Sequence, residues 1–446
     1  MTFRNSLALL LFLALIMNGC SKKGGTDTPP VDVGCVNPVF PASGALVTST
    51  SVTFSWTAAA GAVSYDLFVS TSSTAGTTPV ATNITGTSYT YTIPATPNTT
   101  YYWSVLGKNS AATRVCFPIG FSFVYSTIQA PPPFGYYVVG YFPSYRNLTE
   151  VPDVKFRMTS VVVYAFYSVS SSGTLSAPAS PTASLAAVRD KARTNNAKVF
   201  LGINDGSGDG KTNFKSMAAT ATGRNNFIKD IMNTVRANDL DGVDMDWEFP
   251  TTSDGTDMTF TLLMKELSDS LHRDAKYYLS AAITAGKYAG SIRDAIRSEL
   301  FPYVDLFNVM AYDDFNTTVP YRHHSDYTLA QTCLNYWLNT RGMPAAKCVL
   351  GLPAYGRPSG ITQSGTVLTY KTILAQGGNP QYDSAIVTAG GFTNYTIYYN
   401  GQYTVKRKAK LAKDIANGVM LWEKWQDAVD GNSLLKAACD TVGRAY

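Results

Sequence analysis

From Asn37 to about Tyr125, apolar and polar residues alternate in short runs. The runs are rich in Thr, Ser, Val and aromatic residues, and Gly, Pro and Asn separate them; they include "SVTFSWTAA", "SYDLFVST", "SYTYTI" and "TYYWSVLGKN". A period of two places the apolar side chains on one face of a strand, so each run predicts a strand with one buried face. Residues 37–126 are therefore expected to form an all-β sandwich.

The pattern changes after the proline-rich stretch "QAPPPFG", and residues 127–134 are expected to be a stiff linker. Apolar runs of strand length then alternate with amphipathic runs of helix length. The strand candidates are "YYVVGYF", "SVVVYAFY", "KVFLGIN", "GVDMDWEF", "YYLSAAIT", "LFNVMAYD", "CVLGLPAYG" and "GVMLWEKW", and the helix candidates include "TASLAAVRDKARTN", "NNFIKDIMNTVRAND", "MTFTLLMKELSDSLHRD" and "TLAQTCLNYWLNT". This alternation predicts an α/β fold, a (β/α)8 TIM barrel over residues 135–446, with chemistry at the carboxyl ends of its strands.

The first 19 residues have the pattern of an export signal. One Arg precedes the apolar run "SLALLLFLALIM", which is too short to span a bilayer. The run ends in "MNGC", which resembles the lipobox of bacterial lipoproteins, and the resemblance implies that Cys20 carries the lipid. Residues 20–36 would then tether the protein to a bacterial membrane, expected to be the outer one, in the periplasm or at the cell surface. The alternative is an ordinary secretory signal with a chance cysteine.

Export makes disulfides plausible, and the other five of the six cysteines leave at least one unpaired. The candidates for disulfide bonds are Cys35 with Cys116, which bracket the first domain, and Cys333 with Cys348, which bracket a helical run. Cys439 is the expected free thiol, and the connectivity stays open. The spacings fit no zinc pattern, so no metal is expected. A net charge of +5 without a long basic run argues against a nucleic-acid partner, and the oligomeric state is left open.

The first domain resembles a fibronectin type III module, which has an immunoglobulin-like sandwich fold. Trp56 lies in an early strand, and Tyr101, Trp103 and Val105 alternate in a later one. Single tryptophans in such sandwiches usually fill the core, which favours a spacer that holds the second domain away from the membrane. A sugar-binding module is the alternative.

The stretch "DGVDMDWEF" sets three carboxylates at alternate positions of a strand. Asp244, Asp246 and Glu248 share one parity, while Val243, Met245 and Trp247 share the other. A strand therefore directs the three acids into one small space, where they cannot all stay ionised. A calcium site would need a Gly-turned loop of oxygen ligands rather than acids interleaved with apolar residues. The stretch is a candidate active site.

These residues fill the D-x-x-D-x-D-x-E signature of glycoside hydrolase family 18, and the second domain resembles chitinases of that family over its whole length. The stretches that carry the resemblance, in order, are "VVGYF", "VVYAFY", "DGVDMDWEFP", "VMAYDD", "GLPAYGR" and "GVMLWE". The resemblance implies a substrate-assisted glycosidase, in which the 2-acetamido group of the sugar replaces a protein nucleophile. No cofactor is implied.

The resemblance also implies roles for single residues. Glu248 would be the general acid, with a pKa raised by burial and by Asp246. Asp246 would orient the acetamido group and stabilise the oxazolinium intermediate, Asp244 would share a proton with Asp246, and Tyr312 would donate a hydrogen bond to the acetamido carbonyl. Asp241 has the opposite parity and is expected to be structural.

Aromatic and polar residues near other strand ends are candidates for sugar binding. Trp422 would be the apolar floor beneath the sugar, with packing in the core as the alternative. The other candidates are Met310, Asp313, Tyr141, Phe166, Tyr355 and Arg357. His323 and His324 are expected on the surface or the rim, without a role.

The chain departs from many chitinases at its third strand, where "LGINDG" replaces S-x-G-G followed by Trp. Contacts to distant sugars on the non-reducing side, and polymeric chitin as the preferred substrate, are therefore in doubt. The segment from Ser359 to Asn417 is short, so the α+β insertion of the family is expected to be small or absent. We expect a shallow, open groove, which suits internal cleavage.

Three functions remain in competition. The first is an endo-acting, retaining hydrolase of β-1,4-linked N-acetylglucosamine polymers, with chitin or a related oligosaccharide as its partner. The second is an endo-β-N-acetylglucosaminidase that cuts the chitobiose core of N-glycans with the same acids. The third is a non-catalytic lectin, which the intact Glu248 disfavours.

Overall fold

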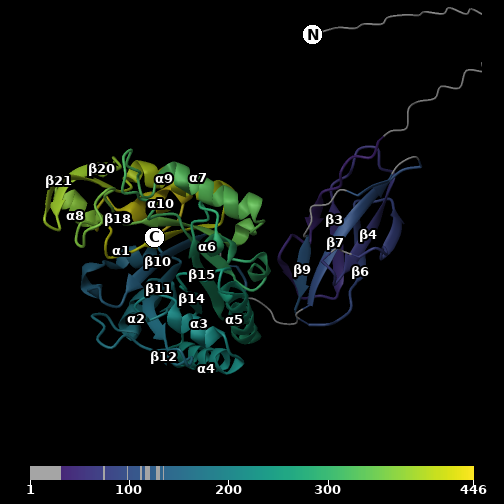
Figure 1. Ribbon diagram of the computed structural model, residues 1–446, viewed down its shortest axis with the longest axis horizontal. Coiled ribbons are helices and arrows are strands. Elements are labelled where there is room, and N and C mark those ends of the chain that lie inside the picture. Colours follow the sequence, from purple (N-terminus) through teal and green to yellow (C-terminus); the bar gives the residue numbers. More distant parts are fainter. Residues whose placement is uncertain are drawn as a thin grey trace, which may run out of the picture.

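The computed structural model describes residues 32–73, 76–97, 99–110, 113–115, 121–126, 131–133 and 135–446. A small all-β lobe precedes a larger α/β lobe (Figure 1). The predicted signal, Cys20 and Cys116 lie outside the described residues. In the described ranges, no helix has both the length and the hydropathy needed to cross a membrane.

Two sheets form the β lobe. Their orders are β1-β3-β6 and β2-β9-β7-β4-β5, with β8 paired to β7. Phe54 and Trp56 of β3 and Trp103 of β7 are buried in a shared core, where the Phe54 and Trp103 rings lie 5.1 Å apart. The tryptophans thus fill the core. The strands are β1 (Pro38–Phe40), β2 (Ala45–Val47), β3 (Ser51–Trp56), β4 (Ser64–Ser70), β5 (Ala81–Ile84), β6 (Ser88–Thr92), β7 (Thr99–Lys108), β8 (Thr113–Val115) and β9 (Ser122–Tyr125).

Eight parallel strands close into the barrel predicted from the sequence. Their order is β10-β22-β17-β16-β15-β14-β13-β11, and pairing of β10 with β11 closes the ring, while the short β12 (Leu175–Ser176) adds antiparallel to β11. All eight predicted strands are confirmed. They are β10 (Tyr137–Pro143), β11 (Val161–Val169), β13 (Lys198–Asn204), β14 (Gly242–Met245), β15 (Tyr278–Thr284), β16 (Leu306–Met310), β17 (Cys348–Pro353) and β22 (Gly418–Trp422).

Helices surround the strands, and several of them begin at capping side chains. Ser184 accepts a hydrogen bond from the backbone of α2, Thr220 from that of α4 and Asp326 from that of α7. The helices are α1 (Asp153–Arg157), α2 (Leu185–Thr194), α3 (Thr212–Ala218), α4 (Ala221–Ala237), α5 (Thr256–Leu271), α6 (Ser291–Asp294), α7 (Tyr327–Leu334), α8 (Tyr370–Ala375), α9 (Gln402–Ile415) and α10 (Leu434–Val442). The four predicted helices correspond to α2, α4, α5 and α7.

A small insertion lies between β17 and α9. It contains the pair β18 (Tyr355–Gly356) and β19 (Leu368–Thr369), helix α8, and the hairpin of β20 (Ser384–Ala389) and β21 (Phe392–Tyr398). The expected insertion is therefore small but present. Because β18 directly follows β17 and pairs with β19, Leu368 and Thr369 of β19 lie at the carboxyl end of the barrel, in one cavity wall with Trp422.

The prediction of a Cys333–Cys348 disulfide is wrong. Both residues are free thiols with no exposed surface, Cys333 in α7 and Cys348 at the start of β17. Burial raises the pKa of each thiol to about 12, so both pack as small apolar groups between helix and barrel. Cys439 is also free and buried, as expected. Cys35 is disulfide-bonded.

Candidate active site

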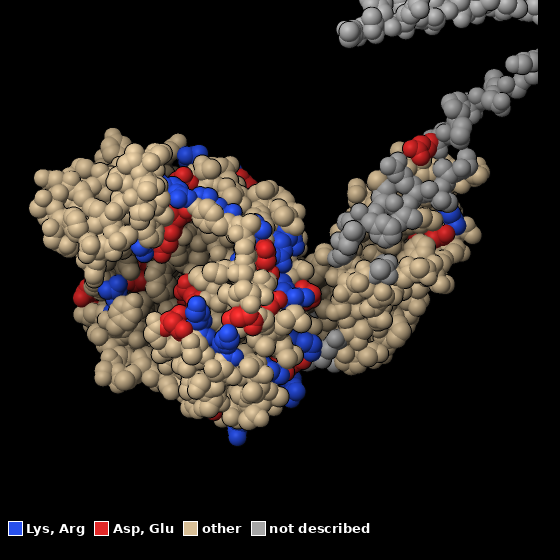
Figure 2. Space-filling model, viewed as in Figure 1, with Lys and Arg blue, Asp and Glu red and all other residues tan. Residues whose placement is uncertain are grey.

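The acidic strand β14 lies with its carboxyl end at a hollow in the larger lobe. Acidic and basic side chains gather around this hollow (Figure 2). Asp244 and Asp246 are buried, Glu248 is exposed at the hollow, and the alternate residues Val243 and Met245 pack outward in the core beneath the helices. The predicted separation of acids and apolar groups onto two faces is therefore confirmed.

Asp244 lies inside the barrel and is held by three donors. Tyr141 Oη donates to its Oδ2 at 2.6 Å, and Asn308 Nδ2 donates to its Oδ1 at 3.1 Å. Ser280 Oγ donates to the same Oδ1. Burial raises the pKa of Asp244, whereas these donors lower it by stabilising the carboxylate. The donors fix the orientation of Asp244.

Asp246 is a buried acid with one unpaired oxygen. Its Oδ1 is buried and has no hydrogen-bond partner among the described residues. Burial raises the pKa of Asp246 well above its usual value, and the neighbouring charges of Glu248 and Asp244 raise it further. Asp246 is therefore a carboxyl group that favours a proton or an incoming N–H donor.

Glu248 follows the end of β14 and lines the larger cavity of the hollow. Although its side chain is exposed to this cavity, the surrounding rim desolvates the carboxyl enough to raise its pKa. The negative charge of Asp313 raises the pKa of Glu248 further, a contribution that the sequence did not predict, while the charges of Glu248 and Asp246 also act on each other. A raised pKa suits an acid that must carry a proton.

Asp313 follows β16 and is anchored through one oxygen. Its Oδ1 accepts from Tyr355 Oη at 2.7 Å and from Arg357 Nε at 3.0 Å, and His324 Nδ1 lies 3.6 Å away. Burial would raise the pKa of Asp313, but His324, Arg357 and Tyr355 lower it below the usual value. Asp313 is therefore ionised at neutral pH, beside Glu248.

The expectation that His324 lies at the surface or rim is wrong. Its side chain is fully buried, and burial lowers its pKa. The ring packs between His323, at 5.6 Å, and Tyr355, at 5.1 Å, which places it behind Asp313. His323 Nε2 is 2.8 Å from the backbone oxygen of Tyr399.

Trp422 ends β22 as a half-buried ring at the base of the hollow. It stacks on Phe166 at 5.8 Å and meets the edge of Tyr141 at 5.3 Å. Tyr141 is buried and bonded to Asp244, so its predicted position in the groove wall is corrected to a support beneath the acids. Met310 and Tyr312 are partly buried beside the same barrel core. Burial, together with Asp246 and Glu248, raises the pKa of Tyr312 well above its usual value.

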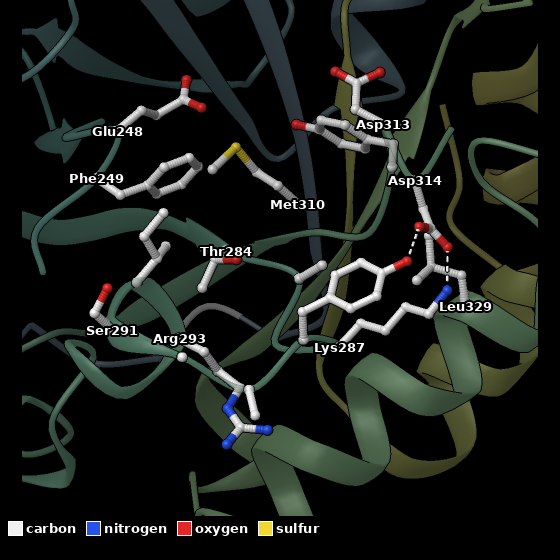
Figure 3. Close-up of a pocket in the computed structure, with 16 residues that line it drawn as sticks. Glu248, Phe249, Thr284, Lys287, Ser291, Arg293, Met310, Asp313, Asp314 and Leu329 are labelled. Carbon is white, nitrogen blue, oxygen red and sulfur yellow. Dashed lines mark hydrogen bonds and ion pairs between the residues drawn. The ribbon is translucent and has the colours of Figure 1, made fainter. Parts of the chain in front are cut away.

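Two cavities share Asp313. The larger, of about 600 Å³, adjoins Glu248, Met310 and Tyr312 and continues along the loop after β15 (Figure 3). The smaller, of about 310 Å³, adjoins Trp422 and is lined by Arg146, Asp313, Tyr355, Arg357, Val367, Leu368, Thr369, Trp422 and Gln426. Because the insertion supplies Val367–Thr369, the groove has a wall on this side and is less open than the sequence predicted.

Some residues that support the site were not predicted. Ser280 and Asn308 are buried polar residues inside the barrel, and both bond to Asp244. Their signal in the sequence is a polar residue at an inward position of an apolar strand. Asp241, as predicted, is structural: its Oδ2 accepts from the backbone N–H of Val199 at 2.9 Å.

Asp205 orders the loop after β13, in the stretch where the chain lacks the S-x-G-G motif. Its buried carboxylate accepts from the backbone N–H groups of Ser207 at 2.8 Å and Phe214 at 2.6 Å. The different sequence therefore builds a self-supported turn into α3. Within the described part of the chain, no three His, Cys, Asp or Glu side chains converge in a way that could hold a metal ion.

Comparison with known proteins agrees with this geometry. The model of the family Glycosyl hydrolases family 18 matches residues 137–427. Endochitinase 1 of Metarhizium robertsii is 26% identical over 57% of this chain and 67% of its own length, and a class V chitinase of Arabidopsis thaliana is 28% identical over 55% and 73%. A GH18 chitinase from the chitin utilization locus of Flavobacterium johnsoniae superposes with a TM-score of 0.56 at 25% identity, over 69% of this chain and 94% of its own.

Proposed function

The chain belongs to glycosyl hydrolases family 18 and is a glycoside hydrolase, and we propose that it cleaves β-1,4-linked N-acetylglucosamine polymers at internal bonds. The observation that carries this proposal is the pair formed by Glu248, whose raised pKa keeps a proton at the groove, and Asp246, whose buried oxygen has no partner. The two relatives with chitinase names support the same substrate class.

In the first step, the sugar to be cleaved lies above Trp422 with its 2-acetamido group directed at the acids. Glu248 donates its proton to the glycosidic oxygen, the C1–O bond breaks, and the acetamido carbonyl oxygen bonds to C1. The unpaired Oδ1 of Asp246 accepts the acetamido N–H, which supports the positive charge of the oxazolinium ring. Tyr312 Oη donates to the carbonyl oxygen and holds it in line with C1.

In the second step, Glu248 is ionised and takes a proton from a water molecule. The water oxygen attacks C1 on the face that the leaving sugar vacated, and the bond from C1 to the acetamido oxygen breaks. Two displacements at C1 retain the β configuration of the product. Asp244 stays fixed by its donors and holds Asp246 in a position to exchange a proton as its charge changes.

Sugar contacts are assigned to the two sides of the acids. Trp422 and Phe166 form the apolar floor, and Met310 packs beside the reacting sugar. Tyr355 and Arg357 line the smaller cavity with Asp313. The smaller cavity then holds the part of the chain that stays with Trp422.

The N-terminal part positions the enzyme in this proposal. The β lobe is assigned as a fibronectin type III-like spacer, because both Trp56 and Trp103 are used in its core. Residues 1–19 are assigned as a lipoprotein signal and Cys20 as the lipidated residue, which leaves the enzyme exported and membrane-anchored.

The substrate assignment is tested with a fluorogenic chitobioside and a high-mannose glycoprotein. The wild type is expected to hydrolyse the chitobioside, and Glu248→Gln to lose about 10²–10⁴-fold of that activity. Release of glycan from the glycoprotein without cleavage of chitooligosaccharides would favour the N-glycan-cutting alternative. Retention of chitooligosaccharides without cleavage by either protein would favour a lectin.

A further inference from the structure

The larger cavity extends well beyond the catalytic acids. It begins at Glu248 and Phe249 and continues along the loop after β15, where Lys287 and Arg293 lie (Figure 3). No step proposed above uses this loop. We propose that Tyr288 of this loop is a stacking platform for the sugar on the leaving-group side of the cleaved bond. This inference rests on the proposed function and adds a substrate-binding residue to it.

The direction of the groove places this cavity on the leaving side. Trp422, which lies beneath the sugar that keeps C1, lines the smaller cavity and not the larger one. Glu248, which protonates the oxygen of the departing sugar, lines the larger cavity. A chain that crosses from Trp422 past Glu248 therefore continues toward the loop after β15.

Tyr288 has the exposure that a stacking platform needs. Its side chain is 58% exposed, whereas the other aromatic residues that line this cavity, Phe249 and Tyr312, are partly buried. The faces of pyranose rings carry C–H groups that pack against aromatic rings. Tyr288 is thus the exposed aromatic ring of the larger cavity, within the described part of the chain.

Tyr288 is also held in place, which exposed tyrosines in general are not. Its Oη donates to Asp314 Oδ1 at 2.5 Å, and the Asp314 side chain is only 8% exposed. Asp314 is further bound by Arg322 Nη1, at 2.9 Å, and by Lys287 Nζ. Lys287 Nζ also lies 4.9 Å from the centre of the Tyr288 ring. A ring fixed in this way loses little conformational freedom when a sugar binds.

The test compares two substrates that place different groups on the leaving side. An aryl chitobioside places a flat aryl group there, whereas chitohexaose extends sugars into the larger cavity. Tyr288→Ala is expected to lower kcat/KM for chitohexaose roughly three- to ten-fold, the effect of one lost ring contact, and to lower kcat/KM for the aryl substrate less, because a single aryl ring reaches less of the larger cavity than a chain of sugars does. Tyr288→Phe keeps the ring and is expected to retain most of the chitohexaose activity.

Tyr382→Ala is the matched control, because Tyr382 is 66% exposed and lines neither cavity. Equal activity of Tyr288→Ala and wild type on chitohexaose would overturn the proposal, and so would an equal loss on both substrates. A binding measurement distinguishes failure of this proposal from failure of the proposed function. In a Glu248→Gln background, Tyr288→Ala is expected to weaken chitohexaose binding three- to ten-fold, and unchanged affinity contradicts the platform even where no hydrolysis occurs.

Discussion

At the scale of single residues, one carboxylate outside the acidic strand adds to the effect of burial on the pKa of Glu248. Asp313 is kept ionised by Tyr355 and Arg357, and its charge helps to raise the pKa of Glu248. In the proposed mechanism Glu248 must be protonated, so activity is expected to be lost as pH rises through the pKa of Glu248. The alkaline limit of the enzyme thus depends on Asp313.

Asp313→Asn removes this negative charge and keeps the shape of the side chain. The pKa of Glu248 falls, so the alkaline limb of the kcat/KM profile is expected to move to lower pH. Profiles on an aryl chitobioside measure the shift. Asp294→Asn makes the same charge change on the exposed rim and is expected to leave the limb in place. A limb that stays fixed in Asp313→Asn would contradict the electrostatic coupling.

The sequence predicts the residues of β14 better than their surroundings. The parity of Asp244, Asp246 and Glu248 is a local property of a strand, so it could be predicted without tertiary contacts. The anchoring of Asp313 by Tyr355 joins residues 42 apart, and the burial of His324 depends on the same packing. Such contacts leave no periodic signal, which is why the additional effect of Asp313 on Glu248 could not be predicted from the sequence.

At the scale of the element, β14 and the residues directly after it place acids in buried positions, and this lowers stability. The pKa of Asp246 is raised well above its usual value in the folded state. A carboxyl group with a raised pKa contributes its full stabilisation below about pH 4, which is its pKa in the unfolded chain. This contribution to the free energy of unfolding is lost as pH rises through the pKa of the folded state. Ionised Asp246 therefore lowers the free energy of unfolding at neutral pH.

Asp246→Asn is expected to raise Tm at pH 7 by about 2–4 °C, equivalent to about 1 kcal/mol, and to remove the gain below about pH 4. Activity is expected to fall about 10²-fold, because the acetamido group loses its orienting carboxylate. Thermal melts across pH measure the first effect. A variant less stable than the wild type at every pH would contradict the account.

Asp244, two residues earlier and within β14, provides the matched comparison. Its carboxylate accepts hydrogen bonds from Tyr141, Asn308 and Ser280. An amide at this position would turn its own N–H groups toward some of these donors, which would then lack an acceptor. Asp244→Asn is expected to give no gain in Tm at pH 7. An equal gain in both variants would mean that loss of charge alone, and not the missing partner of Asp246, decides stability.

Elements defined by local periodicity could be predicted, and elements defined by packing could not. The barrel strands and the long helices follow their hydrophobic periods. Cys333 and Cys348 bracket a helical run in sequence, yet the fold uses both as buried thiols. The pair of β18 and β19 in the insertion was not predicted because each strand has only two residues, too few for a period to show.

At the scale of the whole molecule, the two lobes have separate hydrophobic cores. The β lobe packs around Phe54, Trp56 and Trp103, and none of its residues enters the core clusters of the barrel. Where the chain reaches the barrel, Tyr278 Oη donates to the backbone oxygen of Pro132 at 2.8 Å. The barrel should therefore fold without the β lobe.

A chain that begins at residue 127 is expected to keep kcat/KM on soluble chitooligosaccharides within about two-fold of the full chain. The catalytic acids and both cavities of the groove lie within residues 135–446, which is the physical reason. Hydrolysis of chitohexaose measures this, and a pull-down on insoluble chitin is the companion assay. Loss of chitin binding with unchanged soluble activity would assign the β lobe to sugar binding rather than spacing.

The most direct measurement of the central claim is the first turnover of Glu248→Gln on two chitobiosides that differ in leaving group. Cleavage of a dinitrophenyl group needs no proton, whereas cleavage of a sugar does. We expect a burst of about one equivalent of dinitrophenolate at nearly the wild-type rate, and a loss of about 10²–10⁴-fold on chitooligosaccharides. An equal loss on both substrates would show that Glu248 is not the acid that protonates the leaving oxygen.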